Sequence, residues 1–180
     1  MKQIFTNIGH ISICDVPEPT LKKGFIKIKV HYSCISAGTE ISTIKGSSKS
    51  ILNRVLEDPS KVSQVVKIAK DQGIRGVKNK LNSINEKLGT VGYSISGEVI
   101  DVGDNVENIR VGDLVAAGGG GYAVHAEVVV VPKNLVVKVP VGVDLIPASL
   151  GTVGAIALHG VRRANLALGE YGVVFGVGLI

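Results

Sequence analysis

The second half of the sequence repeats one short pattern, a valine-rich run followed by a turn signal. The runs lie within GYSISGEVIDVGDNV, VGDLVAA, AVHAEVVVVP and LVVKVP, and Gly, Pro or an Asp-Asn pair bounds each of them. Beta-branched residues favour strands, and glycine, proline and asparagine favour the turns between strands. Short strands at regular spacing indicate a barrel or a sandwich. We therefore expect a mainly β fold.

The N-terminal segment, residues 2–36, carries the same signal. Apolar and polar residues alternate from Phe25 to Val30, which is the period of a half-buried strand. Hydrophobic residues make up 45% of the chain and charged residues 19%. This composition predicts a packed core and excludes a disordered chain.

Residues 47–88 differ from the rest of the chain. Apolar residues recur there at helical spacing, for example at Val62, Val65, Val66 and Ala69. The segment from Lys45 to Leu88 holds ten Lys or Arg and four Asp or Glu, a balance of +6, whereas the whole chain carries +5. We predict a basic helical insertion with a solvated face. An anionic sugar is an alternative partner, but no aromatic residues lie among the charges to support nucleic-acid binding.

The C-terminal part predicts a change of architecture. DLIPASLGTVGAIALHGVRRANL indicates one helix, followed by a short strand from Val173 to Phe175 and by Gly176 and Gly178. A strand followed by a G-x-G turn is typical of the start of a dinucleotide-binding βαβ unit. We place one domain at 1–150 and the start of a second at 151–180.

Several classes of protein are excluded. Cys14 and Cys34 are the only cysteines, too few for a disulfide scaffold or a four-cysteine zinc site. The N-terminus lacks the apolar run of a signal peptide, and the apolar stretch from Leu145 to Leu158 is too short to cross a bilayer. We expect a cytoplasmic protein that does not associate with membranes.

These segments together resemble the N-terminal, GroES-like catalytic domain of the medium-chain dehydrogenase/reductase superfamily, which includes zinc alcohol dehydrogenases and quinone reductases. CISAGTEISTIKG matches the first active-site loop, and GYSISGEVIDVGDNVENIRVGDLVA matches the glycine-rich signature in spacing. YAVHAEVVVVPKNLVVKVPVGV matches the later barrel strands. LGTVGAIALHGVRRANLALGEYGVVFGVGLI matches the linking helix and the first Rossmann strand.

The resemblance implies a partly open GroES-like β-barrel with a helical insertion, followed by the first strand of a truncated Rossmann domain. ISAGTE and GYAVHAE are closest to a subgroup of two-domain oxidoreductases associated with polysaccharide operons. The complete protein would use NAD or NADP and act on a small molecule, with a sugar as one candidate. It could form a homo-oligomer. The 180-residue fragment alone would be inactive. An excised domain, a split gene or an interrupted reading frame would each explain a truncated Rossmann domain.

The resemblance also implies that the family's zinc is missing. Its ligand positions fall on Ala37, Tyr93, Ser94 and Thr152, and none of these side chains is a good zinc ligand. Without a metal, a hydrogen-bond donor must stabilise charge on a carbonyl oxygen. We therefore predict no zinc.

The candidate residues follow from the same matches. The predicted catalytic residues are Tyr93, Thr39 and Glu40, with Thr39 and Glu40 on a loop that faces Tyr93. The predicted cofactor-binding residues are Gly176, Gly178, Thr152 and His159. Tyr93 has a second interpretation, in which it only fills the space of the lost metal, and Glu40 could cap the following loop. His125 and His159 are expected to be packed or solvated more often than catalytic.

Two classes of function remain open. In the first, the chain is the substrate-side part of a zinc-independent, NAD(P)-dependent oxidoreductase that acts on a carbonyl or hydroxyl group. In the second, it is a non-catalytic GroES-like module for binding or assembly, and its altered ligand positions reflect lost chemistry. A continued glycine turn with a downstream acidic residue would favour the enzyme.

Overall fold

The computed structural model describes residues 1–7, 10–48, 89–176 and 178–180. The chain divides into two compact units. One comprises Met1–Ile4, Cys14–Ser36 and Val91–Ile180, and the other comprises Phe5–Ile13 and Ala37–Thr90. The first two residues of the predicted insertion at 47–88 end helix α1 (Ala37–Ser48), and the remainder lies outside the described residues.

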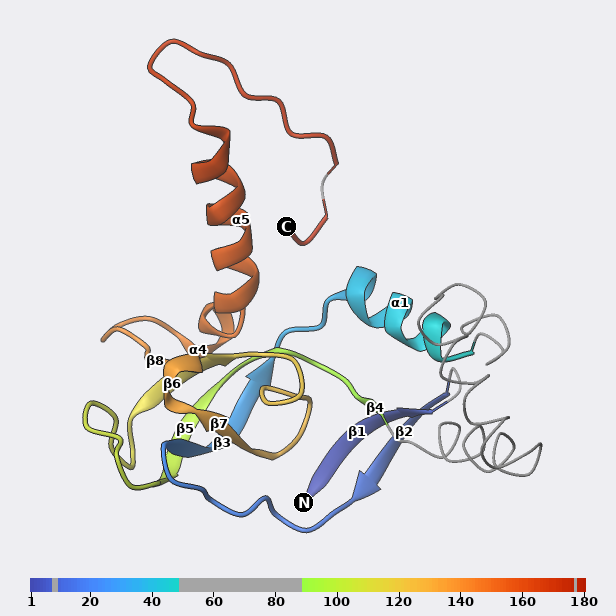
Figure 1. Ribbon diagram of the computed structural model, residues 1–180, viewed down its shortest axis with the longest axis vertical. Helices are drawn as coiled ribbons and strands as arrows, with labels where there is room; N and C mark the ends of the chain where they lie inside the picture. Colours follow the sequence, from blue (N-terminus) through green and yellow to red (C-terminus); the bar gives the residue numbers. More distant parts are fainter. Residues whose placement is uncertain (8–9, 49–88, 177) are drawn as a thin grey trace, which may run out of the picture. The chain divides into compact units, whose positions relative to one another are not determined.

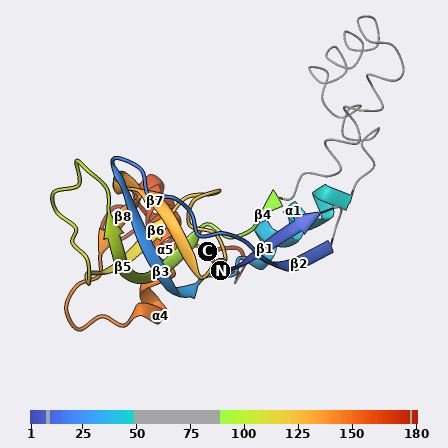
Figure 2. The same ribbon diagram turned by 90° about the horizontal axis from the view of Figure 1, so that it is seen from below.

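A five-stranded antiparallel sheet forms the centre of the first unit (Figures 1 and 2). Its strand order is β7-β3-β5-β6-β8. The strands are β3 (Phe25–Ser33), β5 (Ser94–Val102), β6 (Leu114–Gly118), β7 (Val128–Pro132) and β8 (Val136–Lys138). The sheet curls into a half-barrel, so the prediction of a mainly β, partly open barrel is confirmed.

The core lies on one face of this curled sheet. In β3, Ile26 and Ile28 are fully buried, and Lys27 and Lys29 between and beyond them are more exposed. The core cluster continues through the neighbouring strands with Ile95, Val99, Val115, Val129, Val131 and Val136. Because side chains alternate between the two faces of a strand, the apolar alternation in the sequence fixes which face is buried.

Strands β3 and β5 approach each other closely at Gly97. A Cβ built on Gly97 would overlap the carbonyl oxygen of Lys29 and lie 3.1 Å from Cγ2 of Ile28. The β3–β5 register also shifts between Val30 and Tyr32. Glycine is therefore required where the two strands bend together.

A second sheet has three strands in the order β2-β1-β4. They are β1 (Lys2–Asn7), β2 (His10–Asp15) and β4 (Gly89–Thr90). β4 pairs antiparallel with β1, with Phe5 opposite Thr90 and Thr6 opposite Gly89. Residues 2–36, which the sequence predicts as strands, form β1, β2 and β3.

The segment predicted as one helix forms two, α4 (Leu145–Ala148) and α5 (Gly151–Ala164). Pro147 lacks a backbone N–H, so it is tolerated only within the first turn of a helix. Leu150 then leaves the helical conformation, with φ −83° and ψ 2°, and α5 begins at the next residue. Arg162 and Arg163 lie in the last turn of α5, where the helix dipole favours positive charge.

The strand predicted from Val173 to Phe175 is not formed. These residues have no ladder partner among the described residues, and their side chains are 75–96% exposed. Apolar composition indicated a strand, but a strand exists only where its backbone groups pair with a neighbour. No helix in the described ranges is long and apolar enough to cross a bilayer.

Candidate functional site

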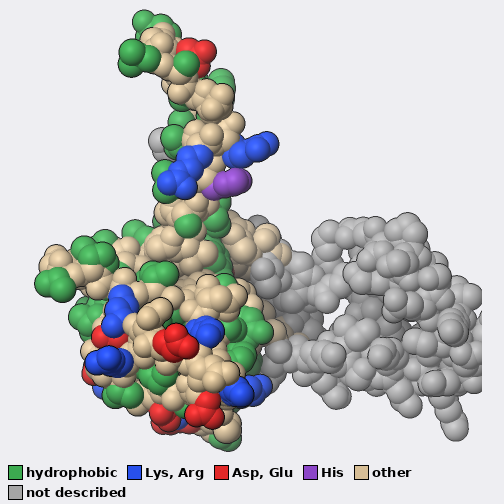
Figure 3. Space-filling view, turned by 60° about the vertical axis from the view of Figure 1, so that its left-hand side comes forward, with side chains coloured by type: hydrophobic (Ala, Val, Ile, Leu, Met, Phe, Trp, Pro, Cys, Tyr) green, Lys and Arg blue, Asp and Glu red, His purple; other side chains and the backbone are tan. Residues whose placement is uncertain are grey.

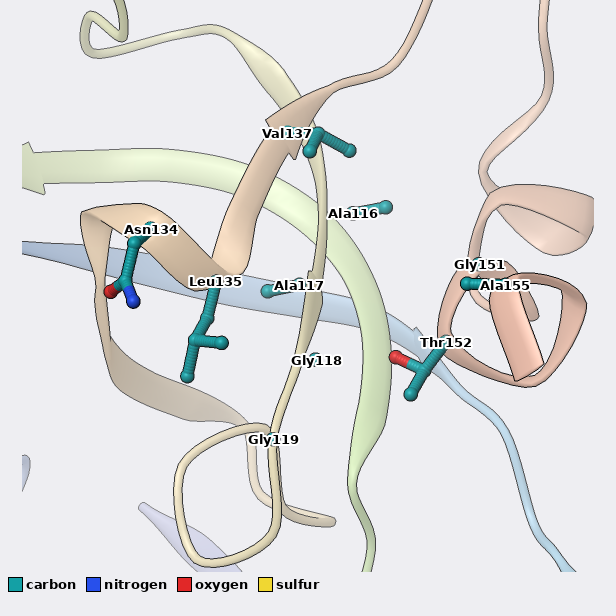
Figure 4. Close-up of a pocket in the computed structure, with 10 residues that line it drawn as sticks. All are labelled: Ala116, Ala117, Gly118, Gly119, Asn134, Leu135, Val137, Gly151, Thr152 and Ala155. Atoms are coloured by element: carbon teal, nitrogen blue, oxygen red, sulfur yellow. The ribbon is translucent and has the colours of Figure 1, made fainter. Parts of the chain in front are cut away.

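A pocket of about 560 Å³ lies between strands β6 and β8 and the start of α5 (Figure 4). A short 3-10 helix, Lys133–Leu135, closes one side of it. The lining residues are Ala116, Ala117, Gly118, Gly119, Asn134, Leu135, Val137, Gly151, Thr152 and Ala155. This volume falls within the range of about 300–1,000 Å³ that is typical of small-molecule sites.

Glycines make room for the pocket at the end of β6. Gly119 has φ +121°, a conformation that other residues rarely adopt, and a Cβ there would lie 2.9 Å from Cδ1 of Leu135. A Cβ on Gly118 would overlap the hydroxyl of Thr152. The absence of two side chains therefore lets Leu135 and Thr152 approach the strand.

Buried serines of β5 fix the helices against the sheet. The Ser94 hydroxyl donates to the carbonyl oxygen of Ser149 at 2.6 Å, and the Ser96 hydroxyl donates to that of Leu145. The backbone N–H of Thr152 points to the Ser94 hydroxyl at 3.4 Å, a long hydrogen bond. Ser94 and Ser96 are at most 1% exposed, so these bonds are shielded from water.

The chemistry of the pocket is mostly apolar. Asn134 and Thr152 supply the polar side chains of its lining, and no described residue with a charged side chain belongs to the lining. The side chains of both residues lack hydrogen bonds within the described part of the chain, so they are available to a ligand. In Figure 4 the Thr152 hydroxyl turns toward Gly118, and Asn134 lies on the other side of β6. Thr152 is thus the predicted site residue that the structure places in a pocket.

Tyr93 lies directly before β5 and is half-buried. Its carbonyl oxygen accepts a hydrogen bond of 2.9 Å from the N–H of Gly119, which lines the pocket. Its hydroxyl has no hydrogen-bond partner among the residues that the structure describes. The Tyr93 side chain is not part of the pocket lining.

Thr39 and Glu40 lie in a helix, which corrects the predicted loop. Both belong to the start of α1, and Glu40 occupies its first turn. The loop prediction rested on the match of CISAGTEISTIKG to the family's first active-site loop. An acidic side chain in the first turn favours the helix through its dipole. Thr39 and Glu40 belong to the second compact unit and Tyr93 to the first, so their predicted proximity stays a prediction.

The remaining predicted cofactor residues are exposed. His159 lies two turns after Thr152 on α5, whose open surface carries apolar, basic and histidine side chains (Figure 3). Gly176 has φ +101°, and a Cβ on Gly176 or Gly178 would meet nothing within 4 Å. These three residues are not in the pocket lining.

His125 is packed, as the sequence indicated. It is 7% exposed, and its Nδ1 lies 2.9 Å from the Ser33 hydroxyl. Its backbone N–H donates to Val91 and its carbonyl oxygen accepts from Ile4. These bonds tie three segments of the first unit together, which is a structural role. Within the described ranges no three His, Cys, Asp or Glu side chains gather in a possible metal site.

Sequence reasoning missed most of the pocket. Leu135 begins the run LVVKVP, which was predicted as a strand, but it lies with Asn134 in the short 3-10 helix before β8. The run Gly118–Gly121 was a usable signal, because glycine repeats mark places where backbone must approach another group closely. Nothing in the local sequence shows that Asn134 and Thr152 line the same pocket.

Comparison with known proteins agrees with this architecture. Residues 69–141 match the family described as "Alcohol dehydrogenase GroES-like domain". The quinone oxidoreductase from Coxiella burnetii superposes with a TM-score of 0.67 at 24% identity, covering 94% of this chain and 47% of that one. The fold is GroES-like.

Two further proteins extend the comparison. (R,R)-butanediol dehydrogenase from Bacillus subtilis is 33% identical over 117 residues, which cover 51% of this chain and 33% of that enzyme. Escherichia coli quinone oxidoreductase, solved in complex with NADPH, has a TM-score of 0.61 at 10% identity, covering 92% of this chain and 41% of that one. The GroES-like chain thus spans a third to a half of the length of these proteins.

Proposed function

We propose that this chain is the substrate-side domain of an NAD(P)-dependent oxidoreductase that interconverts a carbonyl and a hydroxyl group. The observation that carries the proposal is the pocket beside Thr152, built by the GroES-like sheet and the start of α5. The 33% identity to a butanediol dehydrogenase and the NADPH complex of a structural neighbour support the reaction class and the cofactor.

In this proposal Tyr93 donates its hydroxyl to the substrate oxygen, and Thr39 and Glu40 complete the catalytic group. Tyr93 is half-buried, and its hydroxyl, which has no partner in the described ranges, is a suitable donor. Charge that develops on an oxygen in the transition state is stabilised most by donors that are already in position. The hydrogen bond from the Gly119 N–H to the Tyr93 carbonyl oxygen would keep the backbone of Tyr93 fixed relative to the pocket.

The proposed reaction does not use zinc. At the positions that match the family's ligands, the chain offers a methyl group at Ala37 and hydroxyl groups at Tyr93, Ser94 and Thr152. Neutral hydroxyls are poor zinc ligands compared with thiolate or imidazole. The Ser94 hydroxyl also donates to Ser149, so its role is structural. Metal analysis of protein purified without chelator tests this point, and stoichiometric zinc that survives dialysis would contradict it.

Gly176 and Gly178 would contact the pyrophosphate of NAD or NADP, with Thr152 and His159 on the cofactor side. Pyrophosphate binding also needs the amides of a helix that follows the glycine turn. The complete protein would work in the cytoplasm on a small molecule, with a sugar of polysaccharide synthesis as one candidate, and homo-oligomer formation is part of the same hypothesis.

The test compares the 180-residue chain with a version that carries the continuation of its reading frame. Each is assayed for reduced-nicotinamide oxidation against a panel of aldehydes, ketones and quinones. We expect turnover by the longer protein and none by the 180-residue chain. If the longer protein binds ligands but turns over nothing on the panel in either direction, the chain is better described as a non-catalytic binding module.

A further inference from the structure

Residues 91–93 end at the proposed donor, Tyr93, and one buried residue packs directly against them. The backbone N–H of His125 donates to the carbonyl oxygen of Val91 at 2.8 Å. A Cβ on Gly92 would lie 2.8 Å from the same backbone nitrogen and 2.9 Å from Nδ1 of His125. The backbone and imidazole of His125 therefore occupy the space that a side chain at residue 92 would need.

The end of β3 holds the imidazole in this place. Nδ1 of His125 lies 2.9 Å from the hydroxyl oxygen of Ser33, the last residue of the strand. The backbone of the histidine is held as well, because its carbonyl oxygen accepts a hydrogen bond of 2.9 Å from the N–H of Ile4. His125 is buried, and a hydrogen bond that is shielded from water fixes the orientation of a ring more firmly than an exposed one.

The turn at Gly92 directs the chain into Tyr93. Gly92 has φ +98°, a conformation that other residues rarely adopt, so the turn requires glycine for its backbone as well as for space. On the far side of the turn, the carbonyl oxygen of Tyr93 accepts a hydrogen bond of 2.9 Å from the N–H of Gly119. Hydrogen bonds to Val91 and Tyr93 thus hold the backbone on both sides of Gly92.

We propose that His125 is a positioning residue for Tyr93. The imidazole, held by Ser33 and packed against Gly92, keeps the Tyr93 hydroxyl in the orientation that the proposed reaction needs. The importance of that hydroxyl rests on the proposed function. His125 touches no reacting group in this arrangement, since it does not belong to the pocket lining, and it acts only through Tyr93. A reacting group that is misplaced by about 1 Å can cost on the order of a hundredfold in rate.

The first experiment needs no turnover and uses the 180-residue chain with ¹³C-labelled tyrosine. Tyr93→Phe assigns the ring resonances of Tyr93. Ser33→Ala removes the hydroxyl beside Nδ1 but leaves the imidazole, so a shift of the Tyr93 resonances reports movement and not the loss of a neighbouring ring. We expect this variant and His125→Leu to shift the Tyr93 resonances, and those of Tyr171, which is 96% exposed, to stay unchanged.

The second experiment is a double-mutant cycle in the longer, active protein. His125→Leu should lower kcat about tenfold with little change in KM, because a displaced donor loses mainly transition-state stabilisation. In the Tyr93→Phe background the same substitution should change kcat by less than about twofold, because the hydroxyl that His125 positions is then absent. His31→Leu makes the same change at an exposed position of β3 and should leave kcat unaffected.

Conservative variants separate positioning from folding. The amide and carbonyl oxygen of asparagine lie near the place of Nδ1, so His125→Asn should recover most of the lost kcat and return the Tyr93 resonances toward their original positions. The amide spectrum of each variant shows whether it is folded. Should His125→Leu not fold, Ser33→Ala takes its place in both experiments.

Two results would overturn the inference. Equal losses of kcat in the parent and in the Tyr93→Phe background would show that His125 serves the fold and does not act through the Tyr93 hydroxyl. Unmoved Tyr93 resonances in folded Ser33→Ala and His125→Leu variants would show that His125 does not hold Tyr93 in place. Full turnover by Tyr93→Phe would contradict the proposed donor instead, and the resonances of the 180-residue chain would then decide the position of Tyr93 by themselves.

Discussion

The side chain of Thr152 lies directly against the backbone of Gly118, so a methyl group on Gly118 would overlap the Thr152 hydroxyl. This contact joins the start of α5 to the last residue of β6. It also sets one wall of the pocket, because both residues belong to its lining. The position of α5 on the sheet thus depends on the absence of a side chain at residue 118.

We predict that Gly118→Ala destabilises the chain by about 1–3 kcal/mol, the usual cost of forcing an extra methyl group into a packed contact. Gly120→Ala is the matched control from the same glycine run. A Cβ on Gly120 meets nothing within 4 Å, and its φ is not in the left-handed region, so its effect should stay within about 0.5 kcal/mol. Equilibrium urea unfolding of both variants tests this prediction, and equal stabilities would refute it.

The second prediction concerns the hydroxyl that fixes the helices to the sheet. Ser94→Ala removes the donor to the Ser149 carbonyl, which lies at a 95% buried residue. A buried carbonyl left without its partner costs about 1–3 kcal/mol. Ser42→Ala removes a similar bond, from the Ser42 hydroxyl to Thr39, on an exposed turn of α1.

We expect the Ser42 variant to differ from the parent by less than about 0.5 kcal/mol, because water replaces an exposed partner. The comparison is made by denaturant unfolding at neutral pH. A Ser94 variant as stable as the Ser42 variant would mean that the buried bond contributes nothing to the packing of α4 and α5.

Most of the fold could be predicted from local patterns. The alternation from Phe25 to Val30 gave β3 and its buried face, and the valine-rich runs gave β5 to β8. These features depend on neighbours in the sequence, and the period of a strand is short enough to read in a few residues. The resemblance then supplied the order and the barrel, which periodicity alone could not.

Two of the errors depend on partners distant in the sequence. Val173 to Phe175 is apolar enough for a strand but lacks a ladder partner among the described residues. Residues 37–40 matched an active-site loop by resemblance but begin α1. The pocket joins Asn134 and Thr152, which only the folded sheet brings together. Of the candidate site residues, which the sequence assigned without this pocket, Thr152 alone lies in its lining.

The third prediction is a pH dependence at Asp113, which precedes β6. The ion pair and hydrogen bond with Lys138 at 2.7 Å lower the pKa of the Asp113 carboxyl below its ordinary value, and the N–H of Arg110 adds to this. A carboxyl with a lowered folded-state pKa stabilises the protein at pH values above its unfolded pKa of about 3.9. That stabilisation is lost as the pH falls through the lower, folded-state value.

Asp113→Asn should therefore reduce the melting temperature at pH 7, and the difference from the parent should shrink as the pH falls below the unfolded pKa of about 3.9 and through the lower folded-state pKa. The pair is partly exposed, so the effect should be small and should decrease with added salt. Asp104→Asn is the control, because Asp104 forms no ion pair with a described residue. A melting difference for Asp113→Asn that does not change with pH would rule out the ionic origin.

The last prediction concerns the proposed donor. Tyr93→Phe removes one hydroxyl and leaves the ring, so in the longer, active protein it should lower kcat on the order of a hundredfold. KM should change little, since the hydroxyl acts mainly on charge that develops in the transition state. Tyr122→Phe removes a hydroxyl from a half-exposed residue whose ring lies 6.3 Å from that of Phe25, and it should leave turnover unchanged. If steady-state kinetics give both variants the same kcat, Tyr93 only fills space at the matched ligand position, and the donor must be sought elsewhere, with the Thr152 hydroxyl in the pocket as the next residue to replace.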